Sequence, residues 1–197
     1  METTEKVMTP EESFKVIEQM INSAKTNIAK EDGLMYLTWG LLVFIAALSQ
    51  FILIKMNSEL NSLPWAIFMP LGGVISMILG FKKRKTEKVK THVDQLLGYM
   101  WIAFGVTLAI VLFSQGRLGI ENTLPLVMAL YGVGTFVSGG ALKFKPLIIG
   151  GVFCWGLSII SFRVGIENQL LLLATSVVGS YIIPGFILRS RYKNDNL

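Results

Sequence analysis

Six stretches of about twenty residues contain no charged side chain, and this feature constrains the fold more than any other. A helix needs about 20 apolar residues to cross the hydrocarbon core of a bilayer, because each residue adds only about 1.5 Å of length. A helix also satisfies its own backbone polar groups, as lipid requires. The predicted spans are 34–54, 62–81, 96–114, 123–142, 146–162 and 169–188.

The composition agrees with a membrane protein, since 52% of the 197 residues are hydrophobic and only 16% are charged. A water-soluble domain of this size could not bury so much apolar surface. The sequence therefore predicts an all-α integral membrane bundle of six transmembrane helices. Residues 1–33 form a leader before this bundle, 34–190 form the transmembrane domain, and 191–197 form a tail.

Basic residues are concentrated in every second connection between the predicted spans, and this bias predicts the orientation of the protein in the membrane. Fifteen of the eighteen Lys and Arg residues lie in the leader, the 82–95 loop, the 143–145 turn and the end of the chain from Arg189 onward. The other connections hold only Lys55, Arg117 and Arg163. By the positive-inside rule, both termini are cytoplasmic, and a cytoplasmic (inner) membrane of bacterial type is expected. This role accounts for the net charge of +5, so nucleic-acid binding is not expected.

One connection motif occurs twice. The sequence Arg-x-Gly-Ile-Glu-Asn begins at Arg117 and again, forty-six residues later, at Arg163. Over 117–145 against 163–191, nine of twenty-nine positions are identical. The pattern predicts a duplicated helical hairpin, and weaker similarity extends it to three hairpins. Because each hairpin starts and ends on the same side, the repeats are parallel.

The repeated motif would place two acids and two bases at one external face, where they could bind a small polar ligand or a cation. Alternatively, each Arg-x-x-x-Glu closes its own turn and each Asn caps the following helix. Both alternatives stay open at this stage. The residues of this possible external polar site are Arg117, Glu121, Asn122, Arg163, Glu167 and Asn168.

The leader carries a helix-start pattern in which Thr9 is the N-cap, Pro10 the first helical residue and Glu12 the reciprocal partner. We expect a helix from there to about Gly33. Its apolar residues recur at spacings of three and four, so they share one face. The helix either lies along the membrane or on the bundle, or docks a cytoplasmic protein partner or a second copy. The possible docking face comprises Phe14, Ile17, Ile21, Ala24 and Ile28.

Aromatic side chains gather near the ends of the predicted spans, where amphipathic rings favour the headgroup level. We therefore expect them to anchor helices at the interface rather than to bind ligands. These residues are Tyr36, Trp39, Trp65, Tyr99 and Trp101.

The sequence lacks the residue groups that usually carry chemistry. No span contains an ionisable Asp, Glu, Lys, Arg or His, which is unlike a proton- or sodium-coupled transporter. His92 is the single histidine, Cys154 is the single cysteine, and no metalloprotease or nucleophile-elbow motif is present. We expect no catalytic, cofactor-binding or metal-ligating residues, and hence no enzyme.

The segment Glu12-Ser13-Phe14-Lys15-Val16-Ile17, followed by Tyr36-Leu37-Thr38-Trp39-Gly40, resembles a group of uncharacterised bacterial multi-spanning membrane proteins. The resemblance covers mainly residues 10–50 and implies no activity. The sequence therefore favours a non-enzymatic accessory, sensory or protein-interaction component of the membrane. The alternative is a small-molecule carrier built from repeated hairpins.

Overall fold

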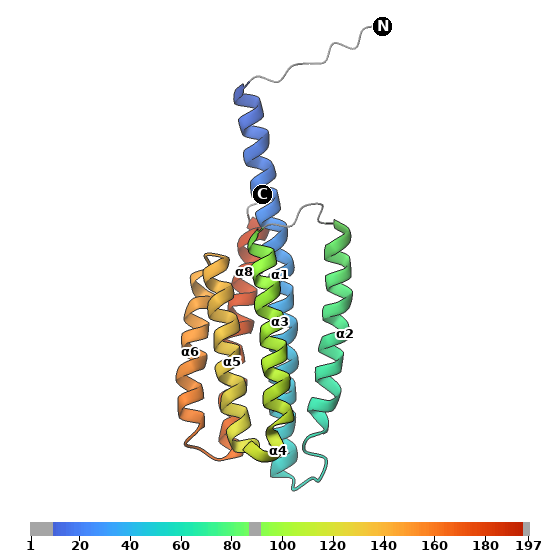
Figure 1. Ribbon diagram of the computed structural model, residues 1–197, viewed down its shortest axis with the longest axis vertical. Coiled ribbons are helices and arrows are strands. Elements are labelled where there is room, and N and C mark those ends of the chain that lie inside the picture. Colours follow the sequence, from blue (N-terminus) through green and yellow to red (C-terminus); the bar gives the residue numbers. More distant parts are fainter. Residues whose placement is uncertain (1–9, 87–91, 195–197) are drawn as a thin grey trace.

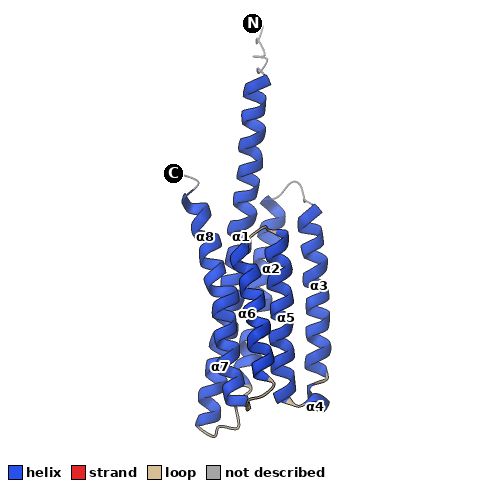
Figure 2. Cartoon of the chain, turned by 90° about the vertical axis from the view of Figure 1, so that its left-hand side faces the viewer, coloured by secondary structure: helices blue, strands red, loops and turns tan. Residues whose placement is uncertain are grey.

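The computed structural model describes residues 10–86 and 92–194, with side chains for 33–81, 93 and 95–190. The described chain is helical and contains no strand. Its long helices lie side by side along one direction (Figures 1 and 2). The elements are α1 (Pro10–Lys55), α2 (Leu63–Thr86), α3 (His92–Phe113), α4 (Gln115–Leu118), α5 (Ile120–Ala141), α6 (Lys145–Ser161), α7 (Ile166–Val177), the π-helical turn η1 (Val178–Ile182) and α8 (Ile183–Asn194).

The prediction of an all-α membrane bundle is confirmed. Among the described residues, five helical segments are long and apolar enough to cross a bilayer, and each agrees with a predicted span. The segment predicted at 146–162 forms α6, which is apolar but has only 17 residues. The five longer segments are Gly33–Lys55, Leu63–Phe81, Gln95–Phe113, Ile120–Ala141 and Ile166–Ser190.

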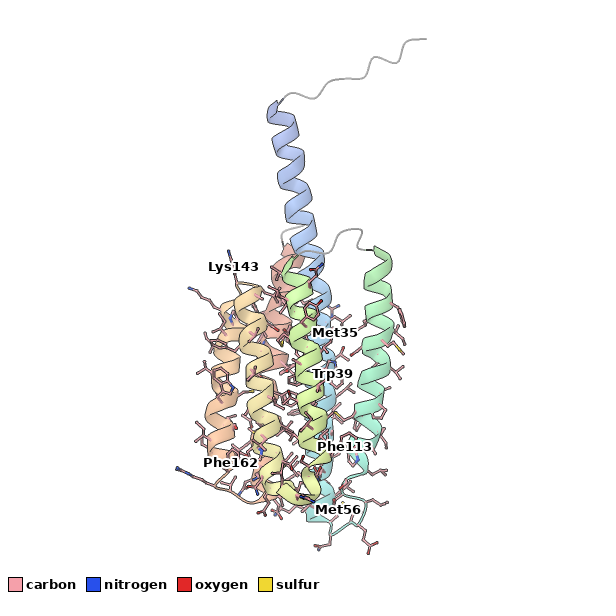
Figure 3. All side chains as sticks on the ribbon, in the orientation of Figure 1. Met35, Trp39, Met56, Phe113, Lys143 and Phe162 are labelled. Carbon is pink, nitrogen blue, oxygen red and sulfur yellow. The ribbon has the colours of Figure 1, made fainter. Side chains whose placement is uncertain are left out.

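The turns between helices alternate between the two ends of the bundle. Lys143, between α5 and α6, lies at the end where α8 leaves the bundle, which we call the N/C end (Figure 3). Met56, Phe113 and Phe162 lie at the opposite end, which we call the distal end (Figure 3). The helix α6 therefore runs from one end of the bundle to the other despite its short length.

The helices divide into a packed centre and a periphery. In the centre, α5 packs against α6, and α1 packs against α7, η1 and α8. On the periphery, α2 packs against α1 and α3 packs against α5. No described residue of α3 is fully buried. Apolar side chains exposed in this way suit contact with lipid, which is as apolar as the side chains themselves.

Glycines bring α5 and α6 together. A Cβ added at Gly151 would lie 2.8 Å from the backbone oxygen of Gly132, and one at Gly139 would lie 2.6 Å from the backbone nitrogen of Ile148. A Cβ at Gly132 would overlap the ring of Trp155. Close backbone approach at small residues is the usual basis of helix association in membranes.

The expected helix end near Gly33 is wrong, because α1 continues without interruption from Pro10 to Lys55. Gly33 is buried where α1 crosses α8, and a Cβ there would lie 3.3 Å from the backbone oxygen of Gly185. This glycine therefore allows two helices to approach rather than ending one. The leader and the first predicted span form one helix.

We predict that Gly151→Ala destabilises the protein whereas Gly156→Ala, one and a half turns further along α6, does not. The added methyl at Gly151 would strike the α5 backbone, and overpacking of this kind costs about 1–3 kcal/mol. Gly156 has nothing within 4 Å of the added atom, and alanine is the better helix former. Thermal unfolding in detergent, followed by tryptophan fluorescence, measures both variants. Equal stability of the two would contradict the proposed glycine contact.

Candidate functional site

The repeated motif lies at the distal end, where it starts α5 and α7. Gly119 and Gly165 are the N-caps of these helices, but their backbones differ, with φ of +76° and −70°. The motif thus has the same position in two helices without the same turn. Whether the hairpins arose by duplication stays a prediction. Of the six predicted site residues, Glu167 is half-buried and the others are exposed: Arg117, Glu121, Asn122, Arg163 and Asn168.

The expected ion pair between each Arg and the following Glu is not formed. Within the described part of the chain, a single ion pair occurs, between Lys55 and Glu167. It joins the end of α1 to the start of α7. Arg163 lies in a turn and Gly119 separates Arg117 from α5, so the helical i,i+4 geometry is missing in both motifs. Such partly exposed pairs contribute about 1 kcal/mol or less.

The expectation that Asn122 caps the next helix is also wrong. Asn122 is inside α5, and its Nδ2 donates to the backbone oxygen of Leu118 at 2.7 Å. Thr123 Oγ1 similarly donates to the backbone oxygen of Gly119 at 2.8 Å. Both side chains therefore satisfy carbonyls of the preceding turn instead of the first amides of the helix. Asn168 likewise lies inside α7, after its cap Gly165.

Gln169 connects three backbone segments at the distal end, and this role was not predicted from the sequence. Its Nε2 donates to the backbone oxygens of Glu121 at 2.8 Å, Ser161 at 2.9 Å and Val164 at 3.1 Å. Proline at position 125 has no N–H, so the Glu121 oxygen lacks its usual partner four residues on. The buried amide of Gln169 replaces that donor. The available sequence signal was a proline four residues after Glu121 together with a polar residue starting the last span.

Five aromatic rings form a closed cycle between neighbouring helices. Consecutive ring centroids are 5.2–6.3 Å apart, and most neighbours are tilted or edge-on, as aromatic pairs prefer. The cycle joins α1, α3, α5 and η1, and it attaches α3, which buries little else. Two members, Tyr36 and Trp101, were expected to be interfacial anchors; both contact other helices, and their place at the interface stays a prediction. The cycle runs through Tyr36, Trp101, Phe104, Tyr131 and Tyr181.

Two further tryptophans join α1 to α2. Trp39 Nε1 donates to Ser76 Oγ at 2.9 Å, and its ring lies over Gly72. Trp65 Nε1 donates to Gln50 Oε1 at 2.6 Å, and Gln50 is buried. Their polar atoms connect the first two spans, and their expected place at the membrane interface stays a prediction.

The last span contains a π-helical turn whose cause is Pro184. Proline cannot donate to the carbonyl four residues earlier, and its ring crowds that carbonyl, so the helix widens for one turn. In this turn Ser180 Oγ donates to the backbone oxygen of Ser176 at 2.6 Å. Cys154 Sγ donates to Ser180 Oγ at 3.2 Å, so the buried thiol belongs to the packing between α6 and η1.

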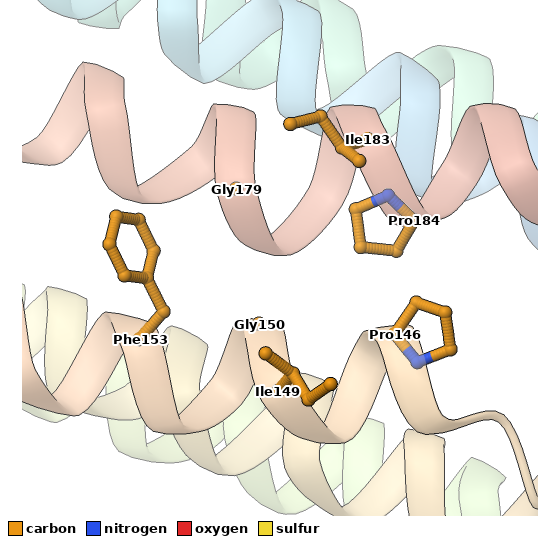
Figure 4. Close-up of a pocket in the computed structure, with 7 residues that line it drawn as sticks. All are labelled: Pro146, Ile149, Gly150, Phe153, Gly179, Ile183 and Pro184. Atoms are coloured by element: carbon orange, nitrogen blue, oxygen red, sulfur yellow. The ribbon is translucent and has the colours of Figure 1, made fainter.

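A groove lies on the outer face of the bundle between α6 and the η1–α8 segment. Its volume is about 390 Å³. Pro146 and Pro184 face each other at one end, and Phe153 extends toward Gly179 at the other (Figure 4). The lining is apolar throughout, and it comprises Pro146, Ile149, Gly150, Phe153, Gly179, Ile183 and Pro184.

Among the described residues, no group of three or more His, Cys, Asp or Glu side chains is placed to hold a metal ion. The side chain of His92 lies outside the described residues. No protein-family model, no curated protein and no solved structure matches the chain. The function is therefore argued from the geometry.

We predict that Gln169→Leu lowers the free energy of unfolding by about 1–3 kcal/mol, because it removes the buried donor from three backbone oxygens. The matched control is Gln95→Leu on the exposed surface of α3, which should change stability little. Thermal unfolding in detergent compares the two variants. Similar stability of both would show that the amide contributes nothing beyond its apolar surface.

The external polar site stays a prediction. We expect that it binds no ligand, because the ammonium group of Lys55 already neutralises the carboxylate of Glu167. The double variant Glu121→Gln and Glu167→Gln should then respond like the unaltered chain to a panel of cations and polar metabolites in thermal unfolding. A ligand that stabilises the unaltered chain but not the double variant would establish the site.

Proposed function

We propose that this protein is a non-enzymatic accessory, sensory or protein-interaction component of the cytoplasmic membrane, and that its leader docks a protein. The proposal includes six membrane crossings with both termini cytoplasmic. Four considerations support it: the course of α1, the leader's apolar pattern, the packing of the bundle centre, and the position of α6.

The main support for docking through the leader is the course of α1. Because the helix is continuous from Pro10, the leader stands beyond the N/C end instead of bending away near Gly33. In both views no other helix lies beside the outer part of the leader, whereas its last turns lie beside the end of α8 (Figures 1 and 2). Residues 10–32 add about 35 Å of helix to the first span. A leader that continues the span axially is poorly placed to lie along the membrane.

The leader's sequence makes such a helix suited to binding. Its apolar residues at three- and four-residue spacing share one face, while most other positions are polar and include several Glu and Lys residues. Apolar surface left in water costs about 25 cal/mol per Å², so covering this face with another helix is favourable. A helix laid against a partner in this way is a recurrent mode of recognition.

The centre of the bundle favours an interaction protein over a carrier. Met128, Leu147 and Leu173, from α5, α6 and α7, have no exposed surface. Leu147 lies near the N/C end beside Gly139, and Met128 and Leu173 lie nearer the distal end, so apolar side chains fill the contacts between the central helices at both levels. A carrier would need a binding cavity at about mid-membrane.

The position of α6 supports the sixth crossing. The helix is about 25 Å long, which is close to the hydrocarbon thickness of a bilayer. Its flanking residues Lys143 and Phe162 lie at opposite ends of the bundle (Figure 3). If α6 crosses the membrane, the fifteen basic residues of the leader, the 82–95 loop, the 143–145 turn and the chain from Arg189 onward all lie on one side of it.

We predict that single cysteines at the two ends of α6 are accessible from opposite sides of the membrane. In a Cys154→Ser background, Arg163→Cys should react with an impermeant maleimide on intact bacterial cells. Lys143→Cys should react only after the cells are lysed. Reaction of both positions under the same condition would contradict the sixth crossing, and the reverse pattern would contradict the orientation.

We predict that the variant with Ile17→Gln, Ile21→Gln and Ile28→Gln loses a bound protein, because glutamine keeps the helix but removes the apolar face. The matched control alters the opposite face through Gln19→Ala and Thr26→Ala. Light scattering of the purified full chain and cross-linking in cells measure self-association and partners. The same oligomer size and the same cross-links for both variants would refute docking through this face.

A further inference from the structure

The groove between α6 and the η1–α8 segment is an apolar surface that faces outward. Ile149 is 67% exposed, Ile183 51% and Phe153 41%, and no polar side chain lines the groove. In a membrane-spanning bundle this outer face contacts the hydrocarbon of the bilayer. The surroundings of the groove therefore favour an apolar occupant.

The depth of the groove comes from missing side chains. A Cβ at Gly150 would lie 2.7 Å from the Cα of Ser180, so the two walls meet at the backbone there. A Cβ at Gly179 would lie 2.7 Å from the ring of Phe153, which closes the groove at its deep end. The groove spans residues 146–153 of α6, about 10 Å, which is less than half of a transmembrane helix. A flexible chain fits this length better than a second helix does.

The mouth of the groove lies beside basic residues at the N/C end. Pro146 is in the first turn of α6, directly after Lys145, and both Lys143 and Lys145 are exposed. Positive charge at the mouth would repel a second copy of this chain but attract an anion.

We propose that this groove binds one acyl chain of an anionic phospholipid, and that Lys143 and Lys145 hold the headgroup phosphate at its mouth. The groove ends at Pro146, directly after Lys145 in the chain, so an apolar groove and exposed basic residues lie next to each other as the two parts of a phospholipid do. Basic pockets between helices near the headgroups are a known means of binding anionic lipids. The proposal does not depend on the leader, so it can succeed or fail separately from the docking function.

The experiment is native mass spectrometry of the full chain, delipidated in detergent and then offered phosphatidylglycerol or phosphatidylcholine with identical acyl chains. We expect the anionic lipid to be retained about 25-fold more than the zwitterionic one, since each of the two lysines contributes about fivefold. Lys143→Gln with Lys145→Gln should reduce this preference to about twofold or less. The control, Arg117→Gln with Arg163→Gln, removes the same charge at the distal end and should keep the preference.

A second variant tests the groove itself. Ile149→Trp should fill the groove and reduce the retention of both lipids, whereas Ile110→Trp on the exposed face of α3 should not. Thermal unfolding checks that each variant folds. Equal retention of the two lipids by the unaltered chain would overturn the proposal, as would equal loss of preference in the two charge variants. A dimer that Ile149→Trp dissociates while lipid retention is unchanged would instead identify a second copy as the occupant.

Discussion

The close backbone contact between α5 and α6 is the interaction on which the rest of the bundle depends. Gly132, Gly139 and Gly151 allow it. Once the helices are this close, Trp155 Nε1 and Ser158 Oγ of α6 donate to backbone oxygens of α5 at 3.1 and 2.8 Å. The other face of α6 meets η1 at Gly150, where the two backbones again touch. The helix α6, with only 17 residues, thus packs against α5 on one side and against the last span on the other.

Side chains that donate to backbone oxygens form a second level of this packing. In lipid, helices gain little from burying apolar surface against each other, so small residues and polar contacts decide the association. Pro125 and Pro184 each remove an amide donor, and a neighbouring helix or a wider turn compensates. The result is a centre without charged groups, filled by packed apolar and hydroxyl side chains. Such a centre serves better as a rigid support for surfaces at its edges than as a path through the membrane.

The surfaces proposed to be functional lie outside that centre. The leader extends α1 beyond the N/C end, and the lipid groove opens on the outer face near the same end. Both surfaces depend on where helices begin and end: α1 does not stop at Gly33, and α6 begins at Lys145, two residues after Lys143. A protein bound by the leader and a lipid headgroup bound at the groove would therefore lie at the same end of the bundle.

The sequence by itself determined the class of fold and the positions of five long apolar helices, because these depend on hydropathy and on residues within a few positions of each other. It could not predict that Gly33 faces Gly185, that Lys55 rather than Arg163 pairs with Glu167, or that Gln169 supplies the donor that Pro125 removes. Each of these depends on a residue more than forty positions away. Only the tertiary structure decides such contacts, because helix crossing sets which side chains meet, and local patterns carry no information about that crossing.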